Sequence, residues 1–174
     1  DMLTTQAMAE SFYMSNMVPQ VGPNMNRTIW ADLEAMARKW SEARQDVQVV
    51  TGPIFEGNVA KMGNGQVWVP TSLYKVVLDL RTLESIAFII RNESSEEPLQ
   101  QLVVSVDKVE NMTGIDFFPL LPDDLENKLE SSANLNAWIW ENSSSTSSVG
   151  NSDTETTQLN QCKGKTKKGT RCKN

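Results

Sequence analysis

Two apolar segments at 73–80 and 85–91 most constrain how this chain can fold. Residues 76–78 and 86–90 are apolar at consecutive positions, with no alternating polar residues. Strands with this pattern are buried on both faces, and the short turn between the two segments predicts a hairpin. Helices or other segments must therefore cover both sides of this hairpin.

A long amphipathic helix is predicted from Asn26 to about Arg44. Its apolar residues recur at intervals of three and four, which gives one apolar face: Ile29, Trp30, Leu33, Met36, Ala37 and Trp40. The remaining pattern predicts strands at 47–55 and 67–70. It also predicts a short helix within 1–10 and helices at 105–112, ending before Gly114, and at 123–131. Trp30 is expected in the core because it lies on the apolar face.

Composition divides the 174 residues into three parts. Residues 1–141 hold 10 basic and 20 acidic side chains, a net charge of −10, whereas 142–174 hold 6 basic and 2 acidic, a net charge of +4. We expect one domain at 1–141, a flexible Ser/Thr/Asn-rich linker at 142–160, and a basic tail with two cysteines at 161–174. No segment approaches the roughly 20 apolar residues of a membrane span.

The motif that points to a chemistry lies ahead of the long helix. It reads S-F-x-x-S-N-x-x-P-Q over 11–20, followed by N-x-x-x-W-x-x-L-E from Asn26 to Glu34. Three further segments belong with it: 49–55 (VVTGPIF), 69–77 (VPTSLYKVV) and 109–119 (VENMTGIDFFP).

Together these segments resemble the DNA/RNA non-specific endonucleases, the ββα-metal or His-Me finger nucleases that include endonuclease G and secreted bacterial enzymes. The resemblance spans about residues 1–131. It implies an α+β fold, a mixed and mainly antiparallel sheet flanked by helices. It also implies a Mg²⁺- or Mn²⁺-dependent hydrolase that cuts phosphodiester bonds in DNA and RNA.

The resemblance also assigns roles to three residues. It makes Asn26 the direct metal ligand, places Glu34 where it holds metal-bound water or a neighbouring cation, and puts Asn16 near the scissile phosphate. Taken alone, Asn26 also fits a helix N-cap, Glu34 a solvated helix face, and Asn16 a turn.

One detail departs from the family pattern nearby, and one residue of a matching segment has two interpretations. An extra residue before Asn26 leaves Asn24 as an alternative ligand. Lys75 is expected to be solvated rather than to face the cleft.

The largest departure is that the chain contains no histidine. The family's general base is a His in an Asp-Arg-Gly-His block just upstream of the motif. We therefore expect a fragment that begins after this block, lacks the N-terminal strands and is close to inactive, since losing a general base costs roughly 100- to 10,000-fold.

The tail raises separate expectations. Cys162 and Cys172 supply half of a tetrahedral zinc site, and flank the basic residues Lys163, Lys165, Lys167, Lys168 and Arg171, which would contact nucleic acid. A plain basic tail and a disulfide loop are the alternatives. Expected partners are DNA and RNA, with no membrane and a homodimer left open; the resemblance favours export in a bacterium. The competing hypothesis is a non-catalytic module that binds nucleic acid or protein on a degenerate nuclease fold.

Overall fold

The computed structural model describes residues 4–13, 16–21 and 25–140. The chain divides into two units, Asp1–Glu141 and Asn142–Asn174, and every described residue belongs to the first. The linker at 142–160 and the tail at 161–174, with Cys162 and Cys172, lie outside the described residues, so the expectations about them stay predictions.

A four-stranded antiparallel sheet forms the centre of the first unit. Its order is β1 (Val47–Ile54), β4 (Ser72–Asp79), β5 (Glu84–Arg91) and β6 (Val103–Val104). A separate small hairpin pairs β2 (Lys61–Met62) with β3 (Val67–Trp68). The predicted hairpin of two buried strands is confirmed, because every residue of β4 is buried and β5 is buried over most of its length.

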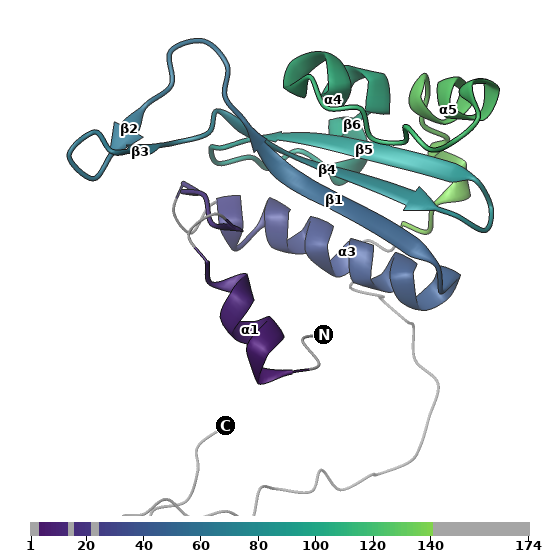
Figure 1. The fold of residues 1–174 in the computed structure, drawn as a ribbon, viewed down its shortest axis with the longest axis horizontal. Helices are drawn as coiled ribbons and strands as arrows, with labels where there is room; N and C mark the ends of the chain where they lie inside the picture. Colours follow the sequence, from purple (N-terminus) through teal and green to yellow (C-terminus); the bar gives the residue numbers. More distant parts are fainter. Residues whose placement is uncertain (1–3, 14–15, 22–24, 141–174) are drawn as a thin grey trace, which may run out of the picture. The chain divides into compact units, whose positions relative to one another are not determined.

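Helices cover the two faces of this sheet (Figure 1). The helix α3 (Ile29–Arg44) lies against one face, and α4 (Val106–Thr113) and α5 (Asp123–Glu130) lie against the other. A short helix α1 (Thr5–Ser11) precedes them, and two 3-10 turns, Leu99–Leu102 and Leu135–Ala137, complete the elements. The predicted α+β fold, a mainly antiparallel sheet flanked by helices, is thereby confirmed. Among the described residues, no helix is long and apolar enough to cross a membrane.

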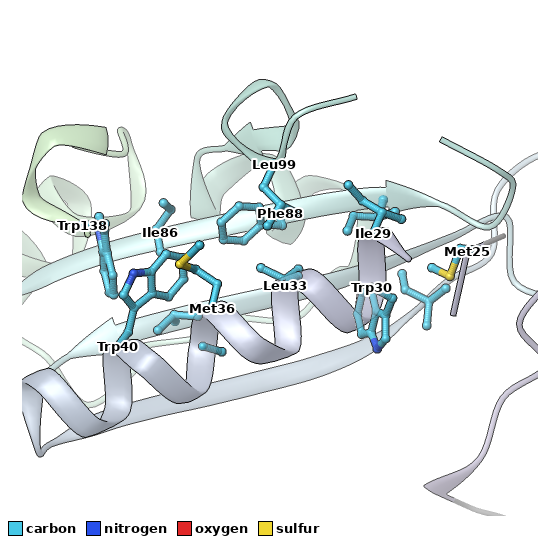
Figure 2. Packing of buried hydrophobic residues seen from close by; sticks show 14 residues of the cluster. Met25, Ile29, Trp30, Leu33, Met36, Trp40, Ile86, Phe88, Leu99 and Trp138 are labelled. Atoms are coloured by element: carbon cyan, nitrogen blue, oxygen red, sulfur yellow. The ribbon is translucent and has the colours of Figure 1, made fainter. Parts of the chain in front are cut away.

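Alternation along β4 gives each face its own core. Leu73 and Val77 pack in the cluster of α3, whereas Val76 and Leu78 pack in the cluster of α4 and α5. On the α3 face the centre is Trp40, whose ring stacks on Phe88 at 6.1 Å and meets the edge of Trp138 at 4.8 Å (Figure 2).

The strand β1 is an edge strand within the described part of the chain, since it pairs with β4 alone. Pro53 lies inside it, which an edge strand tolerates because its missing N–H breaks no central ladder. Gly52 is required by a close approach: a Cβ there would lie 2.6 Å from the hydroxyl of Tyr74. The Gly52–Pro53 pair therefore continues the strand, as the prediction of a strand over 47–55 requires.

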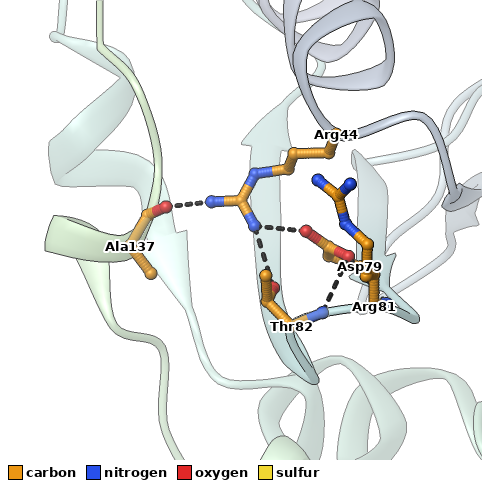
Figure 3. Close-up of polar contacts among 5 residues, drawn as sticks. All are labelled: Arg44, Asp79, Arg81, Thr82 and Ala137. Carbon is orange, nitrogen blue, oxygen red and sulfur yellow. Dashed lines mark hydrogen bonds and ion pairs between the residues drawn. The ribbon is translucent and has the colours of Figure 1, made fainter.

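A buried ion pair ties the end of α3 to the end of β4 (Figure 3). Arg44 Nη1 lies 2.5 Å from Asp79 Oδ2, and the guanidinium also donates to the carbonyl of Ala137 and to Thr82. Burial acts to raise the pKa of Asp79, but hydrogen bonds from Arg44, Thr82 and Arg81 outweigh it and lower the pKa to about 2. The contribution of this carboxylate to stability is therefore present above its usual pKa of 3.8 and is lost as the pH falls through about 2.

We predict that Arg44→Met lowers the free energy of unfolding by about 3–5 kcal/mol at pH 7, because it leaves the Asp79 carboxylate buried without its partner. Urea denaturation measures the change. Arg81→Met is the matched control, since the exposed Arg81 reaches Asp79 through its backbone N–H. Equal losses in the two variants would contradict the assignment.

Candidate active site

Asn26 lies in a helical turn that precedes α3. Residues 25–26 are helical, 27–28 form a turn, and α3 begins at Ile29 with Thr28 as its N-cap. The helix predicted to begin near Asn26 thus begins three residues later, and the N-cap interpretation of Asn26 is wrong. Met25 is fully buried beneath this turn, whereas Asn26 is exposed. The exposed position of Asn26 leaves its side chain accessible from solvent.

Glu34 is exposed on α3, but one of its oxygens is fixed. Trp30, one turn earlier, donates from Nε1 to Glu34 Oε1 at 3.0 Å. Trp30 is buried, as predicted from the apolar face. The indole therefore orients the carboxylate, and the other oxygen remains for water or a cation.

The burial of Lys75 was predicted wrongly from the sequence. It was expected to be solvated, yet it is only 6% exposed. It lies on β4 facing α3, where Nζ donates to Thr51 Oγ1 at 2.8 Å and sits 4.8 Å from the centre of the Trp30 ring. A cation over an aromatic face is stabilised by the ring's negative π-surface.

The electrostatics join Lys75 to the helix. Burial lowers the pKa of Lys75, Glu34 acts to raise it, and Arg38 acts to lower it further. Two cationic groups and one carboxylate thus influence one another across the gap between α3 and β4.

Asn16 closes a local turn. Its N–H donates to the carbonyl of Tyr13 at 2.8 Å, and its Nδ2 donates to the carbonyl of Ser11 at 3.2 Å. Within the described part of the chain, these hydrogen bonds of Asn16 do not involve Asn26 or Glu34. Its catalytic role stays a prediction, and the alternative ligand Asn24 lies outside the described residues.

Sequence reasoning missed Asn92, which holds the loop ahead of Asn26 against the sheet. The buried amide accepts from Val21 N at 2.8 Å and donates to the carbonyls of Pro19 and Pro70. A polar residue two positions after the apolar run 86–90 was its only sequence signal. Its three bonds anchor the segment from which the exposed Asn26 follows.

The sequence of this chain is similar to the sequences of known nucleases. The model of the DNA/RNA non-specific endonuclease family matches residues 1–124. Nuclease C1 of Cunninghamella echinulata var. echinulata is 38% identical over 136 residues, which are 70% of this chain and 54% of that protein. Mitochondrial Endonuclease G of Homo sapiens is 31% identical over 134 residues, covering 67% and 43%.

A solved structure agrees. A chain of the EndoG/EndoGI complex superposes with a TM-score of 0.56 at 29% identity, covering 69% of this chain and 55% of that one. The fold is therefore that of a ββα-metal nuclease. The chain belongs to the DNA/RNA non-specific endonuclease family.

The relatives differ from this chain in length, and several of them are mitochondrial. The chain spans about half the length of Nuclease C1 and less than half of Endonuclease G. Several relatives are mitochondrial by name, including Nuclease EXOG of Danio rerio, at 38% identity over 133 residues, 67% of this chain and 38% of that protein. Export in a bacterium stays a prediction.

We predict that Glu34→Gln lowers the pKa of Lys75 further, because it removes the negative charge that opposes the effect of burial. An NMR titration of the Lys75 side chain measures this pKa. Glu42→Gln, on an exposed position of the same helix, should leave it unchanged. An unaltered Lys75 pKa in Glu34→Gln would show that the two groups are not coupled.

Proposed function

We propose that this chain provides the metal-binding part of a nuclease that hydrolyses phosphodiester bonds in DNA and RNA. The observation that carries the proposal is the exposed Asn26, which does not cap α3, followed on the helix by a Glu34 that Trp30 holds in place. Membership of the nuclease family supports the same reaction class.

The donor chemistry at this site fits a hard divalent cation. Asn26 offers an amide oxygen and Glu34 a carboxylate oxygen, which are donors that Mg²⁺ and Mn²⁺ accept while keeping several waters. We propose Asn26 as the direct ligand and Glu34 as the acceptor for metal-bound water. A bound cation would polarise the phosphate and stabilise the leaving oxygen.

The chain's own cations would act on the substrate. Thr51 and Trp30 hold Lys75 in place, and Glu34 opposes the lowering of its pKa by burial. We propose that Lys75 and the exposed Arg38 add to the field that holds the phosphate. Since the 174 residues contain no histidine, a histidine base would have to come from residues beyond this sequence.

The same absence favours a second candidate function. A nuclease fold without its general base can still bind nucleic acid through metal and basic side chains. In that case the chain acts as a binding module and does not cleave.

A plasmid-nicking assay in Mg²⁺, with and without added imidazole as an external base, tests the proposal. We expect weak nicking that imidazole stimulates, and we expect Asn26→Ala to raise the Mg²⁺ concentration needed for half-maximal nicking by about tenfold or more. Asn58→Ala, at an exposed position, is the control.

The outcomes separate the two functions. Nicking that Asn26→Ala leaves intact would overturn the assignment of the ligand. Plasmid binding in a gel-shift assay without nicking at any imidazole concentration would favour the binding module.

A further inference from the structure

A second group of metal-ligating side chains lies on the opposite face of the sheet from Asn26 and Glu34. It comprises five carboxylates, here called the α4–α5 carboxylate cluster: Asp107, Glu110, Asp116, Glu126 and Glu130. They come from α4, the loop after it, and α5. In Figure 1 these elements cover the face that α3 does not.

The carboxylate oxygens of this cluster converge on Glu130. One set joins Asp107, Glu110 and Glu130, and the other joins Asp116, Glu126 and Glu130; within each set the ligand atoms lie within 4.8 Å of one another. Calcium–oxygen bonds are about 2.3–2.6 Å long. The three oxygens of either set can therefore share one Ca²⁺ without moving apart.

Glu130 is a buried acidic residue at the end of α5. It is only 6% exposed, and its Oε1 has no hydrogen-bond partner among the described residues. Oε1 of Glu126 is likewise buried and unpartnered. A buried carboxylate oxygen without a partner is costly and calls for an explanation.

The fold holds Glu130 in this position. Ser85 on β5 donates to the carbonyl of Leu129, which fixes the last turn of α5 against the sheet. Across the cluster, the backbone N–H of Phe117 donates to Glu110 Oε1 at 2.9 Å and fixes the loop. The carboxylates therefore stand on elements that are anchored independently of any ligand.

The charges around Glu130 are all of one sign. Burial, the negative charges of Glu110, Glu126 and Asp107, and a side-chain hydrogen bond with Glu110 together raise the pKa of Glu130 to about 7. No basic side chain is among the groups that act on this pKa. A local excess of negative charge at a buried oxygen is relieved either by a proton or by a cation.

The side of the cluster formed by α4 and the following loop is open to solvent. A pocket of about 420 Å³ there is lined by Asp107, Glu110 and Asp116, together with Asn111, Gly114 and Ile115. The Asn111 side chain donates a hydrogen bond through Nδ2 to the carbonyl of Asp107. Its amide oxygen is then a further, neutral ligand for a metal ion.

We propose that the α4–α5 carboxylate cluster is a Ca²⁺ site that ties α5 to α4 and the following loop. An all-oxygen donor set from three segments suits Ca²⁺, which takes six to eight ligands in flexible geometry. Mg²⁺ demands a near-ideal octahedron and fits it less well, and Zn²⁺ favours nitrogen and sulfur donors that this cluster lacks.

Calorimetric titration of the 174-residue chain with CaCl₂ at pH 8, combined with melting curves in CaCl₂ and in EDTA, tests the proposal. We expect one Ca²⁺ per chain and a higher Tm with Ca²⁺. Glu130→Gln keeps the shape of the side chain but removes its charge, and should weaken binding by on the order of tenfold or more. Asp124→Asn, exposed on the same helix and outside the cluster, should bind like the wild type.

The Glu130→Gln variant also separates this site from the proposed active site. It should leave plasmid nicking in Mg²⁺ unchanged, so that the two proposals can fail independently. MgCl₂ in place of CaCl₂ should bind more weakly to the cluster.

Three results would overturn the proposal. They are the absence of Ca²⁺ binding, binding that Glu130→Gln leaves intact, and a Tm that responds to pH but not to Ca²⁺. In the last case Glu130 holds a proton: its raised pKa stabilises the fold below about pH 4.5, and this contribution is lost as the pH rises through about 7. Glu130→Gln would then abolish the pH response.

Discussion

The burial of β4 on both faces is the constraint on which the rest of this structure depends. All eight residues from Ser72 to Asp79 are buried, so the strand needs a layer on each side. The apolar face of α3 supplies one layer and α4 with α5 supply the other. The two candidate sites lie on opposite sides of the sheet, one at α3 and the other at α4 and α5.

The α3 site depends on Lys75, a charged residue on that buried strand. Its side chain lies on the α3 face between the apolar Leu73 and Val77, where an unpaired ammonium would be costly. Thr51 and the Trp30 ring stabilise it, and Glu34 opposes its loss of charge. Because Trp30 also donates to Glu34, one indole positions both the carboxylate and the cation. A change at Trp30 would therefore alter both charges together.

The elements were predictable from sequence because each is specified locally. Consecutive apolar residues indicated β4 and β5, the spacing from Ile29 to Trp40 indicated α3, and Gly114 marked the end of α4 with a φ of 70°. The family motif around Asn26 and Glu34 was equally visible. What could not be predicted depends on partners distant in sequence: Lys75 is buried by Trp30 and Thr51, and Asn92 bonds to Pro19 and Val21, 73 and 71 positions away.

The burial of Glu130, on the other side of the sheet, could not be predicted from the sequence either. The segment at 123–131 reads as a helix with acidic residues in its first turn, where the helix dipole stabilises them. Glu130 lies in the last turn, where the dipole disfavours a negative charge, and α4 buries it there. Neither its position on the helix nor its neighbours stabilise the charge. A carboxyl group so placed is stabilised either by a proton, as its raised pKa reflects, or by a cation at its unpartnered Oε1.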